Sequence, residues 1–228
     1  VQIGDYDLLS VKAQIDIPVV EDKLLLRGSV VKTTRDGYTK NLINSSEDID
    51  FDDLISGRFT IKYLPTDNLD ITVHASLVND DGDVAASKQI VIDPAGFYAS
   101  ATQISDPRAV MFDQGPSTAP VETRAFDVAV KWDLGWSELT SITGYNDVEF
   151  LGQRLDGDAT ELRGISQGQL GVANGYHGDS ETFTQELVLS SQNESKLTWL
   201  AGLFYLSDDG FQQGGAEIFQ FAPIFIQS

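Results

Sequence analysis

The chain has 228 residues, of which 35 are acidic and 15 are basic, so its formal net charge is −20. This balance argues against a nucleic-acid partner and against adhesion to anionic lipid, because both need clustered Lys and Arg. Cysteine is absent, which excludes disulfide frameworks, cysteine-based zinc sites and thiol catalysis.

No run of 18 or more apolar residues occurs, so no transmembrane helix is predicted. A membrane protein remains an option, because the strands of a β-barrel alternate lipid-facing and lumen-facing residues and keep a modest mean hydropathy. Nothing near Val1 resembles a signal peptide, and we therefore expect a mature segment or a fragment.

The first predicted hairpin rests on an alternation of apolar and polar residues with a period of two. Apolar and polar residues alternate over 9–17, and less cleanly over 23–34, which predicts two strands with one apolar face. The connection is residues 18–22, where Pro18 is expected to stop ladder pairing and Glu21-Asp22 is turn-like.

The second and third hairpins repeat this plan. Residues 55–63 and 69–77 alternate on either side of a turn that begins at Pro65. Residues 126–132 are predicted to pair with residues 138–149. Apolar and polar residues do not alternate clearly in the second of these strands, so a bulge is possible there.

A fourth hairpin joins residues 182–190 to 197–207, which brings the prediction to about eight strands of roughly ten residues. Long polar stretches separate the hairpins: 36–52, 79–121 and 151–181. Short turns on one side and long loops on the other are typical of outer-membrane barrels, whereas a soluble β-sandwich distributes loop length more evenly.

Aromatic residues on or near the ends of the predicted strands fit the interfacial girdles of such a barrel. They are Tyr63, Trp132, Trp136, Phe183, Trp199 and Tyr205. The alternative explanation is that aromatic residues are enriched in any strand.

Five stretches cover nearly the whole chain: 15–27 with 35–38, 57–58 leading into 63–72, 141–145, 184–191 and 199–205. Together they resemble the barrel of the TonB-dependent receptors, and they follow the order of that family. None is a strict signature alone, but the five in order are fairly specific. The variety resembles most the large receptor sets of sphingomonad-type bacteria.

The resemblance implies a 22-stranded antiparallel barrel, with an N-terminal plug in its lumen, in the Gram-negative outer membrane. Residues 1–228 would then be a mid-barrel portion of the barrel domain, about a third of the wall, with the plug domain not present in the chain. Closure of eight strands into a small barrel is the alternative.

The implied function is import of a scarce nutrient, most of all a ferric siderophore or similar iron complex, with energy supplied through the TonB complex. The expected partners are outer-membrane lipid, a small iron-chelate ligand, and the TonB complex by way of the absent plug. A passive porin or structural barrel is one alternative, and a secreted β-sandwich that binds ligands is another.

An enzyme is not predicted, because no catalytic triad context, glycine-rich phosphate loop or His-Glu-x-x-His helix occurs. No catalytic residue, metal ligand or cofactor is therefore assigned. The loops Asn79–Asp83 and Asp156–Asp158 are rich in oxygen ligands, but neither has the spacing of a calcium loop, and solvated loop tips are favoured.

Candidate site residues come from the polar faces of the strands and from one loop. Five cations are expected on the lumen-facing side beside Asp16, Asp70 and Asp127: Lys12, Arg27, Arg58, Lys62 and Lys131. Pairing of these charges with each other or with the plug is favoured, and a basic lumen that attracts anionic ferric chelates is the alternative. His74 is expected on the same face as a hydrogen-bonding group. In the predicted loop 151–181, Arg154, Tyr176 and His177 form a candidate substrate-contact patch, with a solvated loop as the alternative.

Overall fold

A computed structural model of the chain describes residues 1–43, 48–83, 95, 101–112, 119–156, 171–192 and 197–219. At strand positions 151, 153–156, 171–176 and 215–219 it describes the backbone alone. The described residues form strands and their connections, and none of them forms a helix long and apolar enough to cross a membrane.

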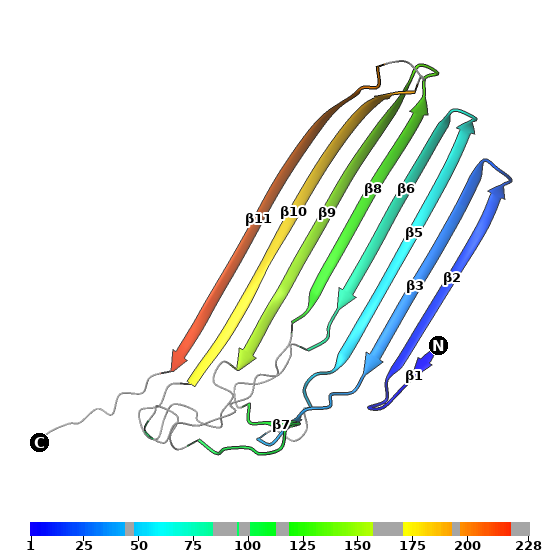
Figure 1. Cartoon of the computed structure of the whole chain (residues 1–228). Helices are drawn as coiled ribbons and strands as arrows, with labels where there is room; N and C mark the ends of the chain where they lie inside the picture. The colour runs from blue at the N-terminus through cyan, green and yellow to red at the C-terminus, as the bar shows by residue number, and fades with distance from the viewer. Residues whose placement is uncertain are drawn as a thin grey trace, which may run out of the picture.

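Nine strands form one antiparallel sheet, shown in Figure 1. In order across the sheet they are β1 (Gln2–Ile3), β2 (Leu9–Val20), β3 (Leu24–Arg35), β5 (Asp52–Thr66), β6 (Leu69–Asp80), β8 (Val121–Asp133), β9 (Ser137–Asp156), β10 (Gly171–Ser191) and β11 (Leu200–Phe219). Strands β4 (Lys40–Asn41) and β7 (Ala109–Val110) pair in parallel outside it. The predicted all-β fold of four hairpins is confirmed, and the sheet is not closed.

The two strands of every hairpin are joined at the same end of the sheet, which we call the turn end, and the long connections between hairpins lie at the opposite, loop end (Figure 1). The turns use residues suited to their backbone. Asp22 adopts a φ of 56° in the first turn, and Gly135 a φ of 82° in the third, where its N–H lies 2.7 Å from Oδ1 of Asp133.

The last three strands are longer than predicted. Strands β9, β10 and β11 have 20, 21 and 20 residues, so the expected length of about ten was wrong for them. The expected connection 151–181 was also too long, because β9 continues to Asp156 and β10 begins at Gly171. Polar residues there continue the backbone ladder without a clear apolar face, so periodicity gave no sign of these extensions.

Two local predictions also need correction. Pro18 does not stop the ladder: it pairs with Leu25, and a register shift follows between Pro18 and Val20. A proline is tolerated there because β1 pairs with β2 only at Leu9 and Ser10, and prolines in sheets occur on edge strands and at bulges. The bulge of β9 lies opposite Tyr176–Gly178, beyond the region where it was expected, and pairing with β8 is regular.

The register separates the sheet into two faces. On strands β2 to β8 one face, here called the apolar face, carries the alternating apolar residues, such as Val11, Ile61, Val73 and Val128. The opposite, polar face carries the residues between them. A direct pair always places both side chains on the same face, so these assignments continue from strand to strand.

On β8 to β11 a charged row bounds the apolar face towards the loop end, whereas on β2 to β6 the same row is apolar: Ala13, Val30, Gly57 and Leu77. On β8 the apolar residues end at Phe126, and the next residue on that face is Arg124. Arg124 is paired directly with Asp147, which is followed across the sheet by Glu181 and Asp209. Trp132 comes eight residues after Arg124, which corresponds to about 27 Å along the strand. If the strand crosses a membrane at a tilt of about 40°, as barrel strands do, this length spans about 21 Å along the membrane normal. The apolar bands of outer-membrane barrels are about 25 Å tall.

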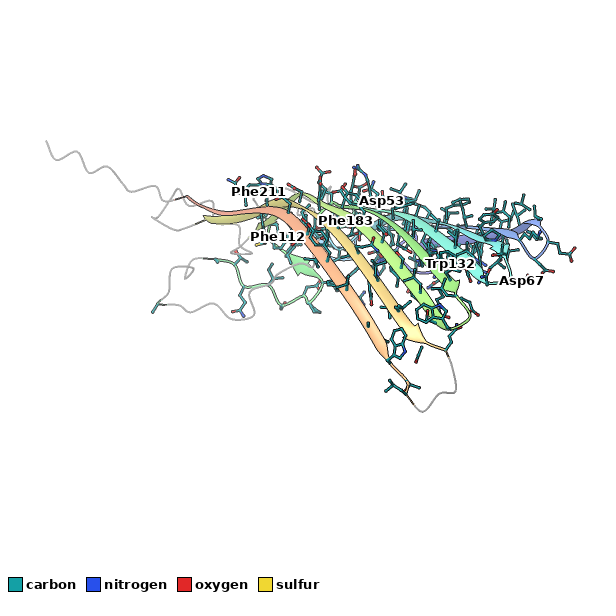
Figure 2. All side chains as sticks on the ribbon, turned by 90° about the horizontal axis from the view of Figure 1, so that it is seen from above. Asp53, Asp67, Phe112, Trp132, Phe183 and Phe211 are labelled. Carbon is teal, nitrogen blue, oxygen red and sulfur yellow. The ribbon has the colours of Figure 1, made fainter. Side chains whose placement is uncertain are left out.

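The sheet is a single layer with side chains on both sides, as Figure 2 shows. The buried apolar side chains all lie in the connections at the loop end: Ile49, Ala109, Val110 and Phe112. In the part of the chain described, the only other sheet is the short β4–β7 pair, so the second layer that a β-sandwich requires is not found there. Large apolar residues of the sheet are exposed instead, including Leu77 at 61% and Leu203 at 74%.

Candidate functional site

The polar face brings together the five cations predicted for one side of the strands. Direct pairing through β2, β3, β5, β6 and β8 puts all of them on it: Lys12, Arg27, Arg58, Lys62 and Lys131. Two form the expected ion pairs, since Arg27 contacts Asp16 and Nζ of Lys62 lies 2.8 Å from Asp70. No ion pair is recorded among the described residues for Lys12, Arg58 or Lys131, and all three are exposed.

His74 lies in the middle of the same face. Its Nδ1 shares a hydrogen bond of 2.8 Å with the hydroxyl of Thr60, and Asp127 is its direct partner on β8. In the row that crosses these strands, Asp16 and Arg27 come next beyond Thr60. The polar face therefore has a continuous band of charged and hydrogen-bonding groups at mid-height, as a water-filled surface requires.

The predicted contact patch lies on strands and not in a loop. Arg154 of β9 pairs directly with Gly175 of β10, so its backbone is next to that of Tyr176. His177 has the parity of the apolar face, beyond the charged row, and its ring meets that of Phe211 edge-on at 5.6 Å. The structure thus brings the three backbones together, and ligand contact by these residues stays a prediction.

The first oxygen-rich loop is held by local hydrogen bonds. Oδ1 of Asp80 accepts from the N–H of Gly82 at 3.0 Å, and the side-chain amide of Asn79 donates to Asp81 at 3.1 Å. Within the described ranges, no three side chains of the kinds that bind metals form a group that could hold an ion. Asp158, in the second such loop, lies outside the described residues.

Two long connections are fastened together at the loop end, which the sequence prediction missed. Strand β4 from the first connection pairs with β7 from the second, and the buried side chain of Asn41 spans them. Its Nδ2 donates to the carbonyl of Phe112 at 2.8 Å, and its Oδ1 accepts from the N–H of Phe112 at 3.1 Å. We call this unit the loop platform; its buried members are Thr39, Asn41, Ile49, Ala109, Val110 and Phe112.

A cluster of two tyrosines and two arginines lies beside the loop platform; we call Tyr6, Arg35, Tyr38 and Arg108 the rim cluster. The tyrosine rings are 5.9 Å apart, and the guanidinium of Arg35 lies 4.9 Å from the centre of the Tyr38 ring. Nη1 of Arg108 donates to the hydroxyl of Tyr6 at 2.7 Å. Arg35 belongs to the polar face and forms an ion pair of 2.9 Å with Asp52. Exposed aromatic rings next to guanidinium groups can stack on and pair with planar anions.

Sequence signals for these units were weak but present. The second connection contains the apolar run Ala109-Val110-Met111-Phe112 within a stretch otherwise read as a polar loop. An apolar run in a long loop indicates that the loop packs against something. Its partner, Asn41, is 71 residues away from Phe112, and no local pattern indicates that pairing.

Comparisons with known proteins agree with this fold. No family model and no curated protein matches the chain. Among solved structures, the chain is similar to the ferric yersiniabactin uptake receptor FyuA from Yersinia pestis, with a TM-score of 0.72 and 11% sequence identity. The open sheet is therefore similar in fold to a part of that receptor. The likeness covers 95% of this chain and 31% of that receptor, so the chain spans about a third of the receptor's length.

Proposed function

We propose that this chain is part of the barrel wall of an outer-membrane receptor that imports a small nutrient. The observation that carries the proposal is the division of one sheet into an apolar face, bounded on β8 to β11 by a charged row, and a polar face with ion pairs. A wall between lipid and a water-filled lumen needs this division. The likeness to an uptake receptor supports the same function.

In this proposal the apolar face borders lipid. Aromatic residues at the turn end support it, since Trp132 and Tyr63 lie on that face near the turns and the rings of Trp136 and Trp199 are 6.2 Å apart. Tryptophan and tyrosine concentrate at the membrane interface because their rings are apolar and their N–H or O–H groups can reach water. Turns at this end would lie in the periplasm, and the long connections outside the cell.

The polar face would line the lumen, and the rim cluster would lie at its outer mouth. A ligand arriving from outside would then first meet the exposed rings of Tyr6 and Tyr38 and the guanidinium of Arg108. Further inside, the exposed cations Lys12 and Arg58 would attract an anionic ligand. Contact with Arg154, Tyr176 and His177 belongs to the same proposal.

The ligand we propose is a ferric siderophore or a similar iron complex, with energy from the TonB system. Two observations support this ligand class and energy source. They are the five ordered stretches that resemble TonB-dependent receptors, and the likeness to a receptor for ferric yersiniabactin. A plug elsewhere in the full-length protein would make the contact with the TonB complex.

The test is uptake by cells. The full-length gene that encodes this chain is expressed in a host lacking its own ferric-siderophore receptors, and radioactive iron is supplied as catecholate, hydroxamate and phenolate complexes. We expect one class to accumulate at least tenfold above the empty-vector control, and a protonophore to abolish the accumulation. No accumulation of any complex, with the protein present in the outer membrane, overturns the iron proposal. Leakage of small sugars that the protonophore leaves unchanged would indicate a passive channel.

A matched pair of variants tests the rim cluster. Tyr38→Leu removes an exposed ring beside Arg35, whereas Tyr63→Leu removes a ring at the turn end. The two side chains are similarly exposed, Tyr38 at 36% and Tyr63 at 44%. We expect the half-saturating ligand concentration to rise at least tenfold for Tyr38→Leu and to change less than twofold for Tyr63→Leu. Equal effects of the two variants would remove the rim cluster from the ligand path.

A further inference from the structure

A groove of about 680 Å³ crosses the apolar face over β2, β3, β5, β6 and β8. It exists because small and large residues alternate in two adjacent rows. The row Ala13–Val30–Gly57–Leu77 lies next to the row Ile15–Gly28–Phe59–Ala75, so the four small residues form a zigzag between large ones. The volume is within the range of small-molecule sites, about 300–1,000 Å³.

The two glycines of the groove are not required by the fold. Neither Gly28 nor Gly57 has a positive φ, and an added Cβ would meet its nearest atom at an ordinary 3.6 Å and 3.9 Å, respectively. By contrast, a Cβ at Gly178 would meet the carbonyl oxygen of Phe211 at 2.3 Å, so that glycine is needed for packing. Glycine inside a strand lowers stability, and where the fold does not need it, it often marks the close approach of another molecule.

A second, independent observation lies at the loop end of the groove. A hollow of about 350 Å³ shares Val30, Gly57, Leu77 and Arg124 with the groove and adds Asn79 and Glu122. The side-chain oxygen of Asn79 is buried and has no hydrogen-bond partner in the described part of the chain, while its nitrogen donates to Asp81. A buried acceptor without a donor among the described residues is a place where a hydrogen-bond donor would be bound favourably.

The other polar groups of the hollow define what that donor can be. Arg124 already contacts Glu122 at 2.9 Å and Asp147 at 3.5 Å, so its charge is balanced and offers little to an anionic group. The acceptors that line this end are the oxygen of Asn79 and the carboxylate of Glu122, which can accept further hydrogen bonds beside its ion pair with Arg124. Hydroxyl or amide N–H groups suit them, and a phosphate or carboxylate would meet repulsion.

From these observations we propose that the groove and hollow bind one amphiphile, with its hydrocarbon chain along the groove and a neutral, hydroxyl-rich head at Asn79 and Glu122. A sugar head on an alkyl or acyl chain is the ligand class with both properties. The site is on the face opposite the candidate ligand path, and so it does not depend on transport.

The test uses the full-length protein and native mass spectrometry. Three ligands with the same dodecyl chain are compared as probes: dodecyl maltoside, dodecyl phosphocholine and dodecyl phosphate. We expect one equivalent of the maltoside to be retained, and at least tenfold weaker retention of the other two, whose heads lack the hydroxyl donors or carry negative charge. Equal retention of all three overturns the proposed head-group preference.

Filling the groove separates this site from general coverage of the apolar face by detergent. Gly28→Leu combined with Gly57→Leu should lower maltoside retention at least tenfold, whereas Ala201→Leu, on the apolar face of β11 outside the groove, should leave it unchanged. If the double variant fails to fold, as judged by heat-modifiable migration on gels, Gly57→Val serves in its place. Unchanged maltoside retention in the filled variant overturns the site. The proposal is also overturned if the protein forms a dimer without bound amphiphile and the filled variant is monomeric, because the groove would then bind a second copy of the protein.

Discussion

Removing the side chain of Asn41 tests how the loop platform is held together. Asn41→Ala takes away the acceptor for the N–H of Phe112 and the donor for its carbonyl, at 3.1 Å and 2.8 Å, both in a buried setting. Leaving a buried group without a partner costs about 1–3 kcal/mol, so two groups together give about 2–6 kcal/mol. The loss should be local, because the platform is outside the ladder of the nine-stranded sheet.

Hydrogen exchange measures this loss directly. The amides of Lys40 and Leu42 donate to the carbonyls of Arg108 and Val110, at 2.9 Å each, and therefore report on the β4–β7 pair. At about 1.4 kcal/mol per factor of ten, their protection should fall by at least about 30-fold, while the amides of β5 and β6 keep theirs.

The matched control is Asn68→Ala. Asn68 donates to the carbonyl of Asp133 at 2.9 Å at the exposed turn end, where water can replace it. Its loss should change protection in the loop platform less than twofold. Unchanged exchange at Lys40 and Leu42 in the Asn41→Ala variant would refute the claim that this side chain holds the platform.

Further predictions concern the two faces and the first long connection. In vesicles, Val128→Arg should lower the free energy of unfolding by about 2–4 kcal/mol, because it places a charge at mid-height of the apolar face. The neighbouring Ala129→Arg, on the polar face, should change that free energy by less than about 1 kcal/mol. Both values are measured by urea titration, and equal losses would contradict the assignment of the faces. Asp16→Asn should cost less than about 1 kcal/mol in the same titration, since Asp16 and Arg27 are more than half exposed, and a loss above about 2 kcal/mol would show that the pair is desolvated in the whole protein. Gly37→Ala should loosen the loop platform as Asn41→Ala does, because a Cβ there would meet the backbone carbon of Asp48 at 2.5 Å; proteolysis of the loops at wild-type rates would contradict this.

Periodicity was sufficient to predict the sheet where the two faces differ in polarity. From β2 to β8 most side chains of one face are apolar, so the alternation that predicts a strand also predicts which residues share a face. This is why Arg58 and His74, far apart along the chain, were correctly expected on one side of the sheet.

The same reasoning fails where the faces do not differ. Between Asp147 and Asp156 on β9, and at the start of β10, the strands are held by backbone ladder bonds. Where the side chains are described, Asp147, Glu149 and Asp179 carry charge on the side that is apolar further down. Backbone pairing depends little on side-chain polarity, so a local pattern could not separate these strands from a polar loop. Arg154 and Tyr176 were therefore placed in a connection when they lie on neighbouring strands.

The candidate site shows the same limit. The cations of the polar face could be predicted from parity alone, but the loop platform and the rim cluster depend on contacts between distant segments. Tyr6 meets Arg108 across 102 residues, and such a contact has no sequence signal without related sequences to compare.

The central claim is that one face of the sheet borders lipid and the other borders water, and spin labelling along β8 tests it most directly. These 228 residues contain no cysteine, so single cysteines can be introduced one at a time at positions 125–131 and labelled in lipid vesicles, in a full-length protein with any cysteine elsewhere replaced. Accessibility to oxygen, which dissolves in lipid, should peak at 126, 128 and 130, and accessibility to a water-soluble nickel chelate at 125, 127, 129 and 131. The assignment of the two faces would be contradicted if the collision rates with oxygen and with the nickel chelate were constant along the strand. It would also be contradicted if the nickel chelate reached position 128 as readily as position 127.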